Sequence, residues 1–195
     1  MTASDSPFPT GLESDSPSHR LLVVRRAGVD DAAALHAVAA ETFALACPPG
    51  TRQSDIDEFV TTQLSEGRMA GYLSDPNREL FIAEIGGEPV GYTMLVYEEP
   101  NDPDVAAAIT ARPTVELSKC YVVGGQHGRG IAPALIAASI ESVRHRGAAG
   151  VWLGVNQRNA RANGFYEKSG FRIVGNKKFL VGTEWHDDYT RELLL

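Results

Sequence analysis

Cysteine is scarce in this chain of 195 residues, which contains only Cys47 and Cys120. Both lie in apolar segments and have no metal-ligand spacing, which excludes a disulfide framework and a cysteine-based metal site. Reduced, buried thiols are typical of cytoplasmic proteins. The sequence therefore predicts a cytoplasmic location and no bound metal.

Basic residues and long apolar runs are also in short supply. The chain has 18 Lys and Arg residues but 25 Asp and Glu residues, which gives a net charge of −7. That balance provides no basic stripe of the kind that binds nucleic acid. No apolar run approaches the ~20 residues that span a bilayer, and the N-terminal stretch has no apolar signal-peptide core. We therefore expect neither nucleic acid nor a membrane as a partner.

The first 19 residues differ in composition from the rest of the chain. They are rich in serine, proline and acidic residues and contain no continuous apolar stretch. Such a segment cannot bury enough surface to offset the entropy lost on ordering. We expect residues 1–19 to be a disordered tail and residues 20–195 to form a single domain, since this length suits one core.

Apolar periodicity divides the remainder into interleaved strands and helices. Asp30 is the expected N-cap of a first helix that runs through Phe43, and Gly170 the expected C-terminal stop of the last helix. Strands are expected over 21–26, 80–85, 90–97, 115–123, 151–155, 171–181 and 184–194, with a last turn at 182–183. Further helices are expected after residue 54 and over 66–73, 133–146 and 160–169, with a helical turn at 106–109. This order predicts one mixed sheet.

A glycine-rich run connects the strand at 115–123 to the helix that follows it. Its residues are His127, Gly128, Arg129, Gly130, Ile131 and Ala132. Backbone N–H groups at a helix N-terminus with little side-chain bulk bind phosphate oxygens. A Walker loop would need Lys after Gly130, and a dinucleotide fingerprint would need glycine where Pro133 stands. The run therefore predicts a pyrophosphate site, with a plain connecting turn as the alternative.

A second motif follows the strand at 151–155. It reads Asn-x-x-Ala-x-x-Phe-Tyr from Asn159 to Tyr166 and closes on a Gly-Phe step at 170–171. In this order and spacing, the glycine loop, helix, strand and motif resemble the GCN5-related N-acetyltransferases (GNAT superfamily). The resemblance runs from about residue 114 to the C-terminus and more weakly back to residue 21. Within the superfamily, the C-terminal half is most similar to bacterial polyamine (spermidine/spermine) N-acetyltransferases.

The resemblance implies an α/β (α+β) GNAT fold: a mixed, mostly antiparallel sheet of about six to seven strands, with helices on both faces. It implies an enzyme that transfers the acetyl group of acetyl-CoA to a primary amine of a small molecule, with a polyamine as one candidate. A homodimer through an exposed hairpin edge is a further option. Two alternatives stay open: a non-enzymatic acyl-CoA-binding sensor, and acetylation of a protein N-terminus or lysine.

The resemblance also implies which residues hold the cofactor. The strand end formed by Tyr121, Val122 and Val123 would pair with the pantetheine arm, and the Val122 amide would polarise the thioester carbonyl. Residues 127–132 would hold the pyrophosphate. Asn159 matches an asparagine that bonds the pantetheine arm, although it can equally be an N-cap.

One position of the phosphate loop departs from the family pattern. The pattern begins with Gln or Arg, and this chain has His127 in that place. The change removes an amide or cationic side chain but leaves the backbone N–H groups in position. Arg129 is a candidate to supply charge to a phosphate, with an exposed surface arginine as the alternative.

Proton transfer sets the demand on the catalytic residues. At pH 7, an alkylamine of pKa about 10.4 is disfavoured in its neutral form by about 4–5 kcal/mol, against about 2 kcal/mol for a free thiolate. Deprotonation of the amine is therefore the larger free-energy demand, and the enzyme needs a base for it. Glu116, among apolar residues of the strand that leads to the loop, is the candidate base, with a solvent-facing glutamate as the alternative. Tyr166 matches the tyrosine that donates a proton to the departing sulfur in many family members.

The acceptor site is expected from acidic and first-helix residues. Candidates for binding a polycation are Glu98, Glu99, Asp102, Asp104, Glu184, Asp187 and Asp188. Thr42 and Phe43 are candidate acceptor contacts, whereas Lys119 has no expected role and His186 is expected to be packed or exposed. No cysteine is near the loop or Tyr166 along the sequence, which favours direct attack in a ternary complex.

Overall fold

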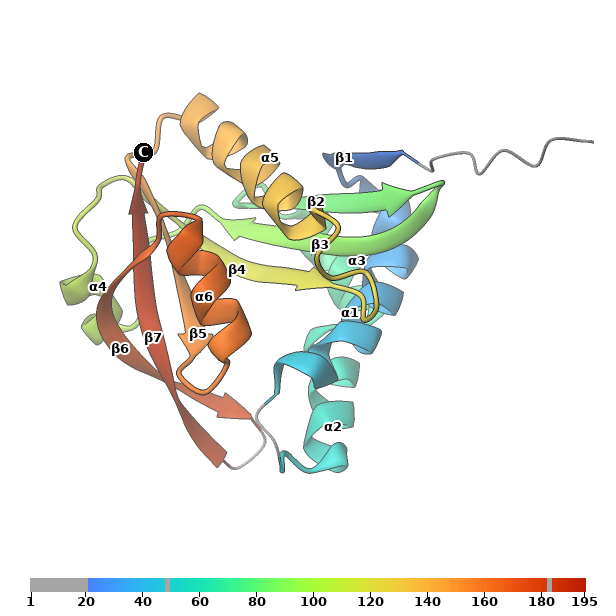
Figure 1. Ribbon diagram of the computed structural model, residues 1–195, viewed down its shortest axis with the longest axis horizontal. Helices are drawn as coiled ribbons and strands as arrows, with labels where there is room; N and C mark the ends of the chain where they lie inside the picture. Colours follow the sequence, from blue (N-terminus) through green and yellow to red (C-terminus); the bar gives the residue numbers. More distant parts are fainter. Residues whose placement is uncertain (1–20, 48–49, 182–183) are drawn as a thin grey trace, which may run out of the picture.

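The computed structural model describes residues 21–195 apart from 48–49 and 182–183 (Figure 1). The expected tail at 1–19 and the expected turn at 182–183 lie outside the described residues. The elements in chain order are β1 (Leu22–Arg26), a short 3-10 turn η1 (Val29–Asp31), α1 (Ala32–Ala46), α2 (Gln53–Gln63), α3 (Glu66–Ser74), β2 (Arg78–Ile85), β3 (Glu88–Val96), α4 (Pro103–Ala108), β4 (Thr114–Val122), α5 (Ile131–His145), β5 (Gly150–Asn156), α6 (Ala160–Lys168), β6 (Arg172–Val181) and β7 (Glu184–Leu194).

The strands form one seven-stranded sheet in the order β1-β2-β3-β4-β5-β7-β6. Every neighbouring pair is antiparallel except β4 and β5, which run parallel. This confirms the expected mixed, mostly antiparallel sheet. The parallel pair at its centre requires a crossover, which α5 provides.

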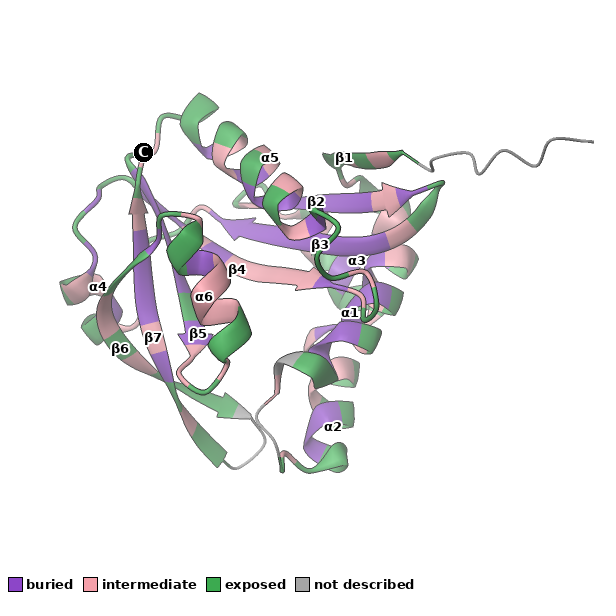
Figure 2. Ribbon diagram, in the orientation of Figure 1, coloured by how far each residue is buried: buried purple, intermediate pink, exposed green. Residues whose placement is uncertain are grey.

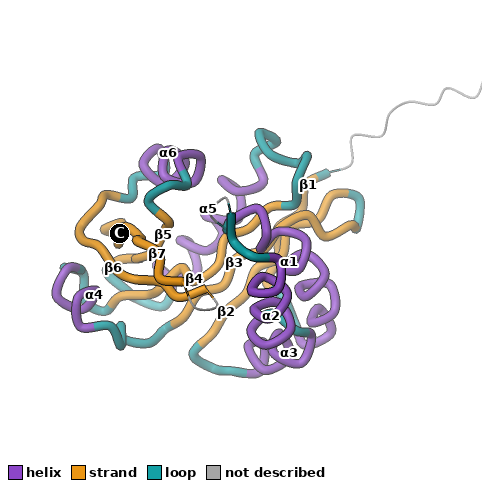
Figure 3. The backbone as a smooth tube through the Cα atoms, turned by 90° about the horizontal axis from the view of Figure 1, so that it is seen from below, coloured by secondary structure: helices purple, strands orange, loops and turns teal. Residues whose placement is uncertain are grey.

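Helices cover both faces of the sheet, as expected (Figure 3). The face under α5 and α6 carries a core cluster that includes Leu135 and Tyr166. The opposite face carries a second cluster under α1, α2 and α3, and a smaller one where α4 packs on Trp152. Figure 2 shows the buried strands between these layers. Among the described residues, no helix combines the length and the apolarity needed to cross a bilayer.

The two central strands separate along their length. They pair at only three positions, of which the last joins Glu116 to Trp152. Beyond this point β4 continues to pair with β3 as far as Val122, while β5 pairs with β7 as far as Asn156. The facing edges of β4 and β5 therefore lack a partner strand over their second halves.

A β-bulge accompanies this separation. On β3, Leu95 is paired with Leu117 and Met94 with Lys119, so Ser118 is an extra residue on β4. A bulge bends its strand and shifts the alternation of side chains beyond it. The bulge therefore turns β4 at the point where it leaves β5.

The first helix begins differently from the prediction. The turn η1 precedes α1, and Asp31 rather than Asp30 occupies the N-cap position without capping through its side chain. Both carboxylate oxygens of Asp31 accept hydrogen bonds of 2.8 Å from Arg25 of β1. The prediction of Asp30 as the N-cap was wrong because an ion pair between β1 and the turn that follows it fixes this corner.

Candidate active site

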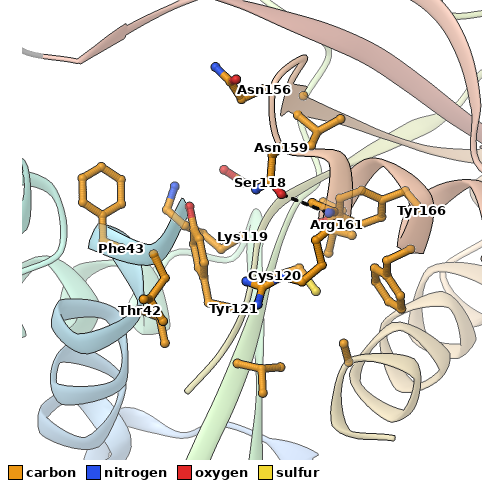
Figure 4. Close-up of a pocket in the computed structure, with 18 of the residues that line it drawn as sticks. Thr42, Phe43, Ser118, Lys119, Cys120, Tyr121, Asn156, Asn159, Arg161 and Tyr166 are labelled. Carbon is orange, nitrogen blue, oxygen red and sulfur yellow. Dashed lines mark hydrogen bonds between the residues drawn. The ribbon is translucent and has the colours of Figure 1, made fainter. Parts of the chain in front are cut away.

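A cavity of about 570 Å³ opens between the separated ends of β4 and β5. Its lining comes from β4, β5 and the loop before α5 on one side, and from α1, α2, α6, β6 and β7 on the others. The residues that approach the opening from both sides are labelled in Figure 4. The sequence motifs at 127–132 and 159–166 meet here, although a helix and a strand separate them along the chain.

The glycine-rich run forms a tight turn that ends at the positive end of α5. Gly125, Gly128 and Gly130 have φ of 75°, 80° and 80°, and Gly130 is the N-cap of the helix. Only glycine adopts this left-handed conformation without strain. Because Gly130 has no side chain, the first N–H groups of α5 are left for a ligand.

The predicted loop residues separate into two groups. His127, Gly128, Gly130, Ile131 and Ala132 line the cavity. Arg129 is not part of the lining, and its Nη1 donates a 2.6 Å hydrogen bond to Gln126.

Arg161 of α6 is a cation beside this loop that sequence reasoning missed. It lines the cavity, and its Nη1 lies 3.4 Å from Nδ1 of His127. A helix in that segment was expected, but only the approach of α6 to the loop gives Arg161 its position. The loop therefore has a positive side chain beside it despite the departure at His127.

The end of β4 presents backbone groups to the opening. The Val123 N–H donates a 2.9 Å hydrogen bond to the Val90 carbonyl on the β3 side. Since successive backbone groups of a strand alternate in direction, the Val122 N–H is directed to the other edge, where β5 no longer pairs. Tyr121 and Val122 line the cavity, whereas Val123 does not.

Tyr166 lies on the α5 side of the sheet. Asn159 is the N-cap of α6 and accepts a 3.0 Å hydrogen bond from the Ala162 N–H, which orients the helix toward the opening. Tyr166 is buried, lines the cavity and packs edge-on to Phe171. Burial raises the pKa of its phenol well above its ordinary value, so the hydroxyl keeps its proton at neutral pH.

A cysteine lies beside Tyr166 in space, although none is near it along the sequence. The side chains of Cys120 of β4 and Tyr166 are close enough to influence each other's pKa, and the Cys120 sulfur points to that side of the sheet in Figure 4. The two residues are far apart in sequence, and only the separation of the strands brings them together. Burial raises the pKa of Cys120 to about 12, so it remains a neutral thiol rather than a nucleophilic thiolate.

The opposite face of the opening carries charged groups. The bulge places Glu116 and Lys119 on the same face, opposite Val96 and Met94 of β3, which belong to the cluster under α1. Both line the cavity, and burial lowers the pKa of Lys119. Lys119 had no expected role because a strand without a bulge would have directed it away from Glu116.

Three phenylalanines form what we call the aromatic wall of the cavity: Phe43 of α1, Phe59 of α2 and Phe179 of β6. The rings of Phe43 and Phe59 stack with centroids 4.3 Å apart, and Phe59 meets Phe179 edge-on at 6.3 Å. All three line the cavity, as does Thr42, whose hydroxyl donates to the Val38 carbonyl at 2.7 Å. The wall connects the helical side of the cavity to the last hairpin.

Of the seven acidic residues expected at the acceptor site, only Asp188 lines the cavity. Asp102 caps α4, Glu99 pairs with Arg112 at 3.3 Å, and Asp187 pairs with Lys178 on the other face of the hairpin. Local partners hold these three at the surface, so the expectation failed for them. A charged segment in a sequence does not indicate which of its members faces inward.

Asp188 is the most perturbed carboxylate of the cavity. Its residue is 7% exposed, and burial raises the pKa of its carboxyl to about 6. Its Oδ1 is buried without a hydrogen-bond partner. His186, two residues earlier on β7, lines the cavity as well, and its Nε2 is likewise buried without a partner.

Neither cysteine forms a disulfide, and both are partly buried. Over residues 21–195, the undescribed gaps aside, no three His, Cys, Asp or Glu side chains gather closely enough to hold a metal ion. The cavity thus combines a phosphate-sized loop and an open strand edge with a neutral phenol on one face of the sheet and carboxylates on the other.

Comparison with known proteins identifies the family. The sequence model of the acetyltransferase (GNAT) family matches residues 41–171. An uncharacterised N-acetyltransferase of Mycobacterium tuberculosis (strain ATCC 25618 / H37Rv) is 44% identical over 166 residues, which cover 84% of this chain and 99% of that protein. An uncharacterised N-acetyltransferase of Lactobacillus delbrueckii subsp. lactis is 23% identical over 78% of this chain and 86% of its own length.

Solved structures agree with the fold. The PaiA N-acetyltransferase of Thermoplasma acidophilum, in complex with coenzyme A, has a TM-score of 0.71 at 17% identity, covering 90% of this chain and 99% of that one. The ribosomal-protein-S18-alanine N-acetyltransferase of Escherichia coli has a TM-score of 0.64 at 17% identity, covering 89% and 94%. The chain therefore belongs to the acetyltransferase (GNAT) family, has the GNAT fold, and is an N-acetyltransferase of that family.

Proposed function

We propose that this protein transfers the acetyl group of acetyl-CoA to a primary amine of a small molecule, by direct attack in a ternary complex. The observation that carries the proposal is the cavity between the separated ends of β4 and β5. It runs from the glycine loop to Tyr166 on one face of the sheet and to Glu116 on the other. Donor, acceptor and both proton-transfer groups would thus have separate places in one cavity.

The residues present fit acetyl-CoA. The N–H groups after Gly130 would hold the pyrophosphate, with Arg161 beside them. The free edge of β4 at Tyr121 and Val122 would pair with the pantetheine arm, and Asn159 would bond that arm from α6. When bound, the cofactor supplies a thioester carbonyl and a thiol leaving group.

The chain's own residues would then move the protons. Glu116, at the point where β4 and β5 part, would take a proton from the amine, directly or through a water. The Val122 N–H would stabilise the developing negative charge on the carbonyl oxygen. Tyr166 would give its proton to the departing sulfur, which its neutral, buried phenol favours.

The contact between Phe59 and Phe179 supports a small acceptor over a protein. It joins α2 to β6 across the cavity and so narrows the approach for a folded chain. A polyamine is one candidate acceptor, because Glu116 and Asp188 attract cations. Lys119 in the same cavity counts against it.

The decisive assay mixes the protein with acetyl-CoA and a panel of primary amines and measures free thiol. We expect thiol release with at least one amine and cofactor binding by calorimetry. Cofactor binding without release for any amine would favour the sensor alternative. Release only with peptide N-termini or protein lysines would support the protein-acceptor alternative.

Direct attack has its own test, because Cys120 lies beside Tyr166. Since burial keeps its thiol protonated, we expect no acetylated cysteine when the protein is incubated with acetyl-CoA alone and analysed by mass spectrometry. Initial rates at varied concentrations of both substrates should give intersecting lines. Parallel lines with acetyl found on Cys120 would establish an acyl-enzyme instead.

A further inference from the structure

Two lysines from separate strands reach the acceptor side of the cavity. Lys119 lies on β4 and Lys177 on β6, and the sheet order places β5 and β7 between them. In the part of the chain that the structure describes, neither forms a salt bridge with a carboxylate. The cavity therefore contains two ammonium groups without a direct ionic partner.

Gly154 makes room for one of them. A Cβ at this position of β5 would lie 3.1 Å from Cδ and 3.6 Å from Nζ of Lys177. The lysine side chain thus extends from β6 over the strand where no side chain stands. Its Nζ lies 5.5 Å from the centre of the Trp152 ring, a contact that attracts the ammonium group without neutralising its charge.

The two ammonium groups influence one another. Burial is the main cause that lowers the pKa of Lys119, and the charges of Arg78 and Lys177 lower it further, while Glu116 opposes them. Holding like charges near each other in a partly buried cavity is unfavourable until an anion comes between them. This part of the cavity is therefore suited to an anionic group.

Asp188, in contrast to the two lysines, is suited to a cationic or hydrogen-bond-donating group. Its Oδ1 is buried and has no hydrogen-bond donor. A buried acceptor without a donor is costly, and an incoming ammonium or amine N–H would remove that cost. A Cβ at Gly154 would lie 3.5 Å from Oδ2 of Asp188, so the acid and Lys177 flank the same glycine.

We infer that the acceptor is a zwitterionic amine of the amino-acid class, whose amino group is bound by Asp188 and whose carboxylate is bound between Lys119 and Lys177. The aromatic wall favours an apolar or aromatic side chain on this acceptor. The inference rests on the proposed acetyl transfer and specifies its substrate class. A polyamine lacks the carboxylate and would place ammonium groups against the two lysines.

Matched pairs of amines that differ by one carboxylate test this inference. We would measure kcat/KM by thiol release for phenylalanine against phenethylamine and for lysine against cadaverine, with spermidine as the polyamine. The carboxylate member of each pair is expected to react at least about tenfold better, which corresponds to about 1.4 kcal/mol. Equal or better turnover of phenethylamine, cadaverine or spermidine would overturn the inference while leaving acetyl transfer intact.

Lysine variants test whether the preference for a carboxylate comes from Lys177. Lys177→Met should raise KM for phenylalanine about tenfold and should not raise KM for phenethylamine, which has no carboxylate to lose its partner. Lys178→Met is the matched control, since this neighbour on β6 pairs with Asp187 outside the cavity. An equal change for both amines in Lys177→Met would overturn the assignment of the lysine.

A protein without turnover would still give a result. Phenylalanine and phenethylamine would then be titrated into the protein saturated with coenzyme A, and their heats of binding compared. Tighter binding of phenylalanine would support the anion site even though the proposed reaction had failed. Equal binding of phenylalanine and phenethylamine would contradict the anion site as well as the proposed reaction.

Discussion

Tyr166 is buried on one face of the sheet, and the carboxylates of the cavity lie on the other. The incoming amine and the departing sulfur occupy different positions around the carbonyl carbon, so proton-transfer groups in separate places suit the proposed reaction. Cys120 lies beside the phenol at the free edge of β4. The role proposed for each residue thus depends on the face that it occupies.

For Tyr166→Phe we predict a fall in kcat of about 10²-fold or more, because the departing sulfur loses its proton donor. The dissociation constant of acetyl-CoA should change little, since the ring remains. Steady-state kinetics and calorimetry measure the two effects. Tyr97→Phe is the matched control: this tyrosine donates a 2.9 Å hydrogen bond to Glu79 and does not line the cavity. An unchanged kcat in Tyr166→Phe would exclude it as the acid.

Asp188 gives a prediction about stability and pH. Its carboxyl has a pKa of 3.8 as a free side chain and about 6 in the folded protein, so between these values the folded state binds more protons. Stability from this group is therefore present below about pH 4 and is lost as the pH rises through 6. Asp188→Asn should accordingly stabilise the protein at pH 7.5 by on the order of 2 kcal/mol, and much less at pH 4.

Thermal unfolding at the two pH values measures this difference. Asp187→Asn provides the control, because its exposed pair with Lys178 is expected to contribute about 0–1 kcal/mol. A destabilised Asp188→Asn at pH 7.5 would show that the buried carboxylate is well satisfied in the free protein. That result would also weaken its proposed role in binding an amino group.

At the scale of elements, α5 connects the site to the fold through its two ends. Gly130 before the helix and Gly147 after it have φ of 80° and 75°, and a Cβ at either would meet nothing within 4 Å. Alanine at either position should therefore cost about 1–2 kcal/mol of stability through backbone strain alone.

The two glycine variants should differ in function. Gly130→Ala is expected to weaken acetyl-CoA binding by roughly tenfold or more, because relief of its strain would rotate the N–H groups at the start of the helix. Gly147→Ala should lower the melting temperature to a similar extent and leave binding unchanged. If calorimetry gave the same affinity for acetyl-CoA in Gly130→Ala as in the unaltered protein, this loop would not hold the pyrophosphate.

The sequence predicted the positions of the strands and helices better than the contacts between them. Most strand and helix boundaries lie within a few residues of their expected positions, because apolar periodicity and glycine stops are local properties. The bulge at Ser118 was not foreseeable, since no local pattern distinguishes it from a regular strand. The N-cap at Asp31 was also missed, because it depends on Arg25 in another element.

At the scale of the whole molecule, β6 is an edge strand with exposed apolar residues on its hairpin. Trp185 is 64% exposed and Leu180 43% exposed, and they face each other across β6 and β7. We propose that this edge forms a homodimer interface, because exposed apolar residues on a free strand edge favour association.

Light scattering on a dilution series should then give twice the mass of the chain. Trp185→Lys is expected to shift this mass to that of one chain, since it places a charge in the apolar contact. His145→Lys, on the exposed end of α5, should leave the dimer intact. A single-chain mass for the unaltered protein at high micromolar concentration would contradict the proposal.

The sequence by itself determined the succession of strands and helices, the glycine loop, and the motif from Asn159 to Tyr166. These features depend on backbone conformation and spacing over a few residues. Only the tertiary structure decided that Cys120 meets Tyr166, that Asp188 alone of the seven acidic residues considered for the acceptor site lines the cavity, and that Lys177 extends over Gly154. Such contacts depend on strand register, on the bulge and on the separation of β4 from β5, which are set by packing between segments far apart in the chain.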